Sequence, residues 1–155
     1  MSNRCREGAS VNDGCAGRAG PGVGKTRTSD IVQQRGRILV VEPDDLIGGL
    51  LDRWLGEAGY TVIIRALREL RGAPIGGEAP QLIVADVPSP RSAEKIIRAL
   101  REVYPSPILV ISARFRRGLG SSTDVARQIG VHRILPKPFT RDELLSAVGE
   151  SIDAQ

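Results

Sequence analysis

The chain has 155 residues, of which 41% are hydrophobic, and this is enough to build one domain with an ordinary core. No apolar run approaches the roughly 20 residues that a membrane helix needs, and no signal peptide is recognisable, so we expect a cytoplasmic protein without membrane contact. The formal charge of +4 comes mostly from the first 36 residues and aromatic residues make up only 3% of the chain, which argues against a nucleic-acid-binding surface.

Residues 1–36 differ in character from the rest of the chain. They show no helical or strand period and hold seven of the 18 glycines, so we predict a disordered tail followed by one domain over residues 37–155. Cys5 and Cys15 lie in this tail without a partner elsewhere, which suits a reducing compartment. The segment AGPGVGKT at 19–26 resembles a phosphate-binding loop, but polar, glycine-rich sequence precedes it where a buried strand should stand, so we discount nucleotide hydrolysis.

Short apolar runs recur from Arg37 onward at intervals that suit alternating strands and helices. Their residues are apolar at consecutive positions, which is typical of strands buried on both faces in a parallel sheet. The predicted strands are Ile38–Val41, Val62–Ile64, Leu82–Ala85, Ile108–Ile111 and Ile134–Leu135.

Helices are predicted in the gaps between these runs. The first has Asp44 or Asp45 as its cap and carries an apolar stripe made of Leu46, Leu50, Leu51, Trp54 and Leu55. The others are a helix capped by Ser92 that ends before Pro105, a short helix over Thr123–Ile129, and a last helix with the capping box Thr140 to Glu143. Glycines and prolines between Ala66 and Pro80 predict a shortened element there. Strands alternating with helices indicate a doubly wound α/β fold.

Four polar residues follow the predicted strands at their carboxyl ends. They are Glu42, Asp86, Ser112 and Lys137, after the first, third, fourth and fifth strands respectively. In an open parallel sheet these ends meet at one edge, where ligands bind. We therefore expect the four side chains to form one site.

This set of side chains suits the acceptance of a phosphoryl group. Two carboxylates can hold Mg²⁺, which prefers oxygen ligands and keeps several waters. A carboxylate can attack phosphorus and form an acyl phosphate when the charge on the transferring oxygens is offset. Lys137 and the cation can offset it, Ser112 can donate to a phosphoryl oxygen, and the small side chain of Ala113 leaves room for entry.

The sequence from Arg37 to about Ile152 resembles the receiver domain of bacterial response regulators. The resemblance rests on RILVVE, LIVAD, ILVISA and GVHRILPKPF in this order and spacing. It implies a flavodoxin-like fold with strand order 2-1-3-4-5, phosphorylation of Asp86, and Mg²⁺ bound by Glu42, Asp86 and the backbone carbonyl of Pro88. It also implies that Ser112 and Lys137 sense the phosphoryl group, and that the Lys137–Pro138 peptide bond is cis.

Two positions depart from the receiver pattern. Pro43 stands where receivers usually have a second acid, so Asp44 either reaches the cation or caps the following helix, and we favour the cap. Weaker Mg²⁺ binding than in a typical receiver is expected. Ile134 stands where receivers generally have an aromatic residue that moves on phosphorylation, so signal transmission is expected to differ.

These observations predict a stand-alone response regulator and not an enzyme. A sensor histidine kinase or phosphotransfer protein would phosphorylate Asp86, and the changed surface of a monomer or weak homodimer would bind a downstream protein. The alternative, motivated by Pro43 and Ile134, is a degenerate receiver that binds its partner without phosphorylation.

Overall fold

The computed structural model describes residues 34–70, 76–115 and 122–155. Nearly all of the predicted tail, including the segment that resembles a phosphate-binding loop, lies outside the described residues. The boundary between tail and domain at residue 36 therefore stays a prediction. No helix among the described residues is long and apolar enough to cross a membrane.

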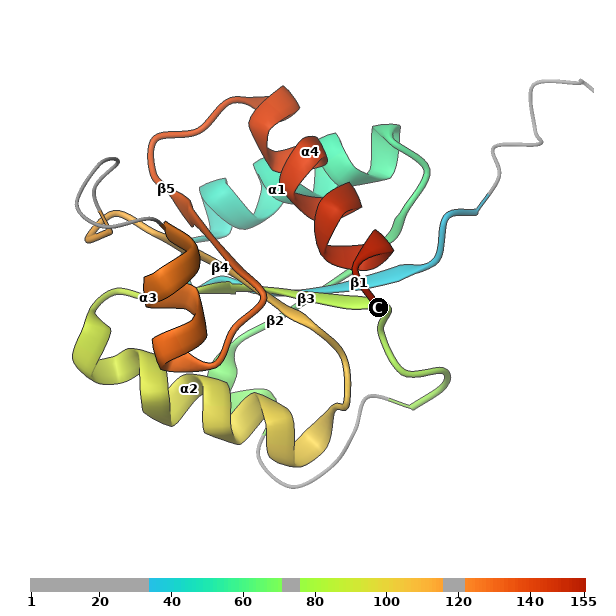
Figure 1. The fold of residues 1–155 in the computed structure, drawn as a ribbon. Helices are drawn as coiled ribbons and strands as arrows, with labels where there is room; N and C mark the ends of the chain where they lie inside the picture. Colours follow the sequence, from blue (N-terminus) through green and yellow to red (C-terminus); the bar gives the residue numbers. More distant parts are fainter. Residues whose placement is uncertain (1–33, 71–75, 116–121) are drawn as a thin grey trace, which may run out of the picture. The chain divides into compact units, whose positions relative to one another are not determined.

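Five parallel strands form one sheet in the order β2-β1-β3-β4-β5, which confirms the predicted topology (Figure 1). Each predicted apolar run lies within one of them. Their bounds are β1 Arg37–Val41, β2 Thr61–Arg65, β3 Leu82–Asp86, β4 Ile108–Ser112 and β5 Arg133–Pro136.

Helices cover both faces of this sheet, as a doubly wound fold requires (Figure 1). Their bounds are α1 Asp45–Glu57, α2 Pro90–Val103, α3 Ser122–Ile129 and α4 Arg141–Asp153, with the 3₁₀ helix η1 at Leu67–Leu70. Side chains such as Leu39 and Ile83 pack on the face of α2 and α3, while Ile38 and Val40 pack on the face of α1 and α4. Because alternate residues of a strand point to opposite faces, the consecutive apolar residues fill two cores.

The predicted apolar stripe of the first helix is wrong at two positions. Leu51 and Leu55 are fully buried, but Leu46 is 85% exposed and Leu50 is 42% exposed. Gly48 is the buried residue of the first turn and its Cα faces the side chain of Ile64 on β2. Gly48, and neither of these leucines, therefore lies against β2, which leaves Leu46 and Leu50 at the surface.

The cap of α2 also differs from the prediction. The hydroxyl of Ser89 accepts a hydrogen bond from the backbone N–H of Ser92, so Ser89 is the N-cap, three residues before the predicted cap. Pro90 follows as the first helical residue, where its missing N–H and fixed φ are favourable. The capping box of α4 is confirmed, since Thr140 and Glu143 exchange both hydrogen bonds.

The crossover from β2 to β3 contains the shortened element that the glycines and prolines predicted. Among the described residues it is the single 3₁₀ turn of η1, whose Leu70 is buried against the sheet. Residues 71–75 lie outside the described residues.

Candidate functional site

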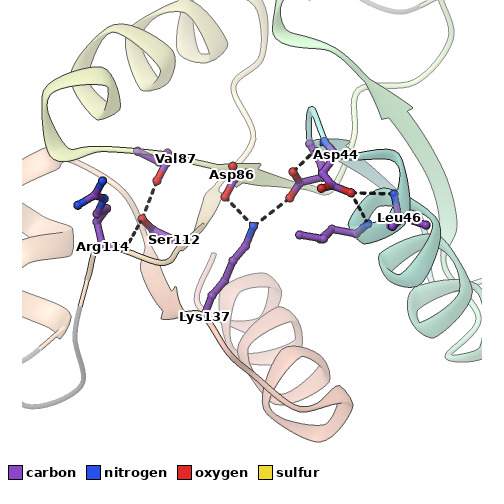
Figure 2. A network of polar contacts seen from close by, with 9 residues as sticks. Asp44, Leu46, Asp86, Val87, Ser112, Arg114 and Lys137 are labelled. Carbon is purple, nitrogen blue, oxygen red and sulfur yellow. Dashed lines mark hydrogen bonds and ion pairs between the residues drawn. The ribbon is translucent and has the colours of Figure 1, made fainter.

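Two carboxylates and one ammonium group meet at the carboxyl edge of the sheet (Figure 2). The Nζ of Lys137 lies 2.9 Å from Oδ1 of Asp86 and 3.3 Å from Oε2 of Glu42. The side chains are largely covered, with exposed fractions of 1% for Glu42, 12% for Asp86 and 19% for Lys137. Three of the four residues that the sequence predicted for this edge therefore converge.

The strand order explains why these three residues meet. Glu42 directly follows β1 and Asp86 ends β3, and the two strands are hydrogen-bonded neighbours. Lys137 follows β5, which lies beyond β4, so its long side chain extends past the end of β4 to reach Asp86. The Lys137–Pro138 peptide bond is cis, as the resemblance implied.

Burial and charge shift the pKa of two of these groups. Burial raises the pKa of Glu42, the backbone hydrogen bond from Asp44 lowers it in part, and the nearby charge of Asp86 raises it further, so that it lies above its usual value. Burial by itself lowers the pKa of Lys137, but the hydrogen bond and charge of Asp86, followed by those of Glu42, outweigh burial and raise it. Lys137 is therefore a cation at neutral pH.

Asp44 caps helix α1, which confirms the favoured alternative for this residue. Its Oδ1 accepts hydrogen bonds from the backbone N–H groups of Leu46 at 2.9 Å and Ile47 at 3.2 Å. Its own backbone N–H donates to Oε1 of Glu42 at 3.1 Å. The carboxylate of Asp44 is therefore bonded to the first turn of α1, whereas its backbone N–H is bonded to Glu42.

Ser112 lies at the same edge, but its hydroxyl bonds to the backbone. The Oγ of Ser112 donates to the carbonyl of Val87 at 2.6 Å and accepts from the N–H of Arg114 at 3.3 Å (Figure 2). Ser112 is fully buried, and the residue after it, Ala113, is exposed. The role of Val87 as the partner of Ser112 was not predicted, because an apolar residue offers no signal that its carbonyl accepts a bond.

The structure also shows where Pro88, Pro43 and Ile134 lie. Pro88 is exposed in the loop between β3 and α2, two residues beyond Asp86, and binding of a cation by its carbonyl stays a prediction. Pro43 is exposed and contributes no acid, while Ile134 is buried in the core with 2% exposure.

The site offers a cation few charged ligands. Among the residues that the structure describes, no three His, Cys, Asp or Glu side chains gather closely enough to hold a metal ion. Glu42 and Asp86 nevertheless both approach the position of one cation, the ammonium of Lys137. Mg²⁺ commonly takes one or two carboxylates and keeps several waters, so these residues fit a weakly held Mg²⁺.

No model of a protein family matches the sequence. The chain is 31% identical over 106 residues to "Regulator of RpoS" of Escherichia coli (strain K12), which covers 66% of this chain and 30% of that protein. It is 33% identical over 115 residues to an uncharacterized transcriptional regulatory protein, YrkP, of Bacillus subtilis (strain 168), covering 72% and 47%. The chain thus spans less than half the length of these relatives.

Solved structures give a matching result. A response regulator from Thermotoga maritima is 25% identical, with a TM-score of 0.60 over 76% of this chain and 98% of that one. The receiver domain of a sensor histidine kinase from Pseudomonas aeruginosa PAO1, described with a magnesium ion coordinated in the active site cleft, is 23% identical with a TM-score of 0.56, covering 76% and 98%.

The sheet order and the acids at its carboxyl edge define a doubly wound domain of the flavodoxin-like class. With the sequence relatives and the Thermotoga structure, they identify the described part of the chain as a response regulator receiver domain. A domain with the receiver fold is generally a signalling module rather than an enzyme.

Proposed function

We propose that this receiver domain accepts a phosphoryl group on Asp86 from a cytoplasmic histidine kinase or phosphotransfer protein. An oxygen of the Asp86 carboxylate forms the new bond to phosphorus while the bond from phosphorus to the donor breaks. The altered surface then binds a downstream protein.

The position of Lys137 supports this proposal most directly. Its ammonium lies between the carboxylates of Asp86 and Glu42, so positive charge is already held beside the acid that would become the acyl phosphate. A fixed cation lowers the repulsion between an anionic nucleophile and an anionic phosphoryl group. The 12% exposure of the Asp86 side chain leaves it accessible to a donor.

Mg²⁺ would bind to Glu42 and Asp86, with the carbonyl of Pro88 as a further ligand. When bound, it would neutralise charge on the transferring oxygens. The magnesium named for the Pseudomonas receiver domain supports this assignment. Ser112 would turn from the carbonyl of Val87 to donate to the phosphoryl oxygen.

Intact-mass measurement tests the proposal. The full chain is incubated with acetyl phosphate and Mg²⁺, and we expect a mass gain of one phosphoryl group that Asp86→Asn abolishes. Asp52→Asn is the matched control, because Asp52 is an exposed acid of α1 and should leave the gain unchanged. Unmodified wild type, under conditions that modify a control receiver, would contradict the proposal.

A phosphorylation-independent binding module is the second candidate. Two observations favour it: β1 is followed by one acid and Pro43, and Ile134 is a buried aliphatic residue without a polar tip. If the domain is such a module, the wild type and Asp86→Asn would bind the same partner equally well, with or without acetyl phosphate.

A further inference from the structure

Glu42 is held from two sides at the end of β1. Its Oε2 contacts the ammonium of Lys137 at 3.3 Å, and its Oε1 accepts the backbone N–H of Asp44 at 3.1 Å. The carboxylate is therefore oriented by a side chain from the far end of the sheet and by a backbone group two residues away. A ligand with both oxygens oriented in advance loses little freedom when it binds a cation.

Pro43, which lies between Glu42 and Asp44, explains why Asp44 is the backbone donor to Glu42. Pro43 has no backbone N–H and a fixed φ, so the first N–H that follows Glu42 belongs to Asp44. The backbone of Asp44 is extended, with φ of −91° and ψ of 116°, and its carbonyl accepts from the N–H of Gly48 at 2.8 Å.

The side chain of Asp44 holds this backbone in place. Its Oδ1 accepts from the N–H groups of Leu46 and Ile47, which attaches the residue to the first turn of α1. An N-cap side chain fixes the position of its own backbone relative to the helix. Removing the cap would free the Asp44 N–H from Glu42 without removing any group that touches the cation.

We propose that Asp44 is a positioning residue, whose capping of α1 orients the Glu42 carboxylate for cation binding through the Asp44 backbone N–H. This inference rests on the cation site of the proposed function. In this proposal Asp44 acts on the cation only through Glu42. The alternative is that the carboxylate of Asp44 is itself a ligand of the ion.

The two roles predict different effects of three substitutions. Asn and Ser cap helices about as well as Asp, but neither carries a charge. For a positioning role, Asp44→Asn and Asp44→Ser keep the dissociation constant for Mg²⁺ within about twofold of wild type, and Asp44→Ala raises it about fivefold. Direct ligation predicts a comparable loss in all three variants.

The experiment is a titration of the ¹⁵N-labelled full chain with Mg²⁺, followed by the amide shifts of residues 42, 44 and 86. Ile108→Val is the control for stability, because Ile108 is buried at the opposite end of β4 and its truncation destabilises by a similar amount. Its dissociation constant should match wild type. Amide exchange on the same samples should be faster at residue 44 in Asp44→Ala and unchanged in Asp44→Asn.

Three results would overturn the inference. They are an unchanged dissociation constant in Asp44→Ala, an equal loss in Asp44→Asn and Asp44→Ala, or no Mg²⁺ response in wild type. Intact-mass measurements with acetyl phosphate separate this inference from the proposed function. If wild type gains no mass but the Mg²⁺ pattern holds, phosphorylation fails and positioning stands, and the reverse pattern leaves only phosphorylation standing.

Discussion

Replacing Lys137 by Met removes the positive charge that lies between two carboxylates. Glu42 Oε2 and Asp86 Oδ1 are both within 3.3 Å of the lysine Nζ, so the two oxygens are at most about 6 Å apart. Met keeps most of the apolar stem of the lysine side chain, so the substitution tests charge more than packing.

The expected loss follows from the repulsion that remains. Two unit charges about 6 Å apart repel by about 3 kcal/mol at an effective dielectric constant of about 20. The pKa of Glu42 shifts upward in this variant, because the charge and hydrogen bond of Lys137 that lower it are gone, and this shift offsets part of the repulsion. We therefore expect the free energy of unfolding to fall by about 2 kcal/mol at pH 7, within the range for removing one partner of a covered ion pair.

Urea unfolding followed by Trp54 fluorescence, in a buffer with a chelator, measures this loss. Trp54 is the only tryptophan of the chain and its ring contacts Phe139 edge to face, near Lys137. The double variant Glu42→Gln with Lys137→Met should regain most of the lost stability, because the second carboxylate charge is gone while an acceptor remains for the Asp44 N–H. Equal m-values would show that the comparison concerns the folded state.

A loss of less than about 0.5 kcal/mol in the free energy of unfolding of Lys137→Met would contradict this expectation. A double variant that is no more stable than the single one would also contradict it. Either result would mean that solvent or a conformational change already relieves the repulsion between Glu42 and Asp86.

Five further substitutions, at four positions, test other parts of the fold by the same urea assay. Leu51 is fully buried, so Leu51→Ala should lower the free energy of unfolding by about 2–5 kcal/mol. Leu46 is 85% exposed, so Leu46→Ala should lower it by less than about 0.5 kcal/mol. Similar losses in the two variants would contradict the observed orientation of α1. Ser112→Ala should lower it by about 1–3 kcal/mol, since the buried carbonyl of Val87 loses its donor, and an unchanged midpoint would refute that bond. Thr140→Ala should lower it by about 1 kcal/mol and Thr140→Ser should not, unless the capping box contributes nothing.

Most of the fold could be predicted from the apolar pattern of the sequence. Consecutive Ile, Leu and Val residues predicted parallel strands, and all five predicted runs lie in the sheet. The pattern identified strands well because burial on both faces demands apolar side chains at every position. It could not place the caps reliably, since Ser89 and Ser92 are both acceptable N-caps and only the geometry around Pro90 selects Ser89.

The site was predictable where it depends on topology. Glu42, Asp86 and Lys137 meet because the carboxyl ends of parallel strands lie at one edge, and the positions of strands in the sequence are enough to infer that. The direction in which each side chain points was harder to predict from the sequence. Ser112 bonds to Val87, and the Asp44 carboxylate bonds to α1, through contacts that depend on distances between backbone groups.

By itself, then, the sequence determined which segments are strands and helices and which polar residues end at the functional edge, because periodicity and chain order are local properties. Only the tertiary structure decided that Gly48 faces the sheet while Leu46 and Leu50 are exposed, and that Lys137 lies between two acids. Which face of a helix is buried, and which partner a polar group finds, depends on elements that are far apart in the chain and become neighbours only when it folds.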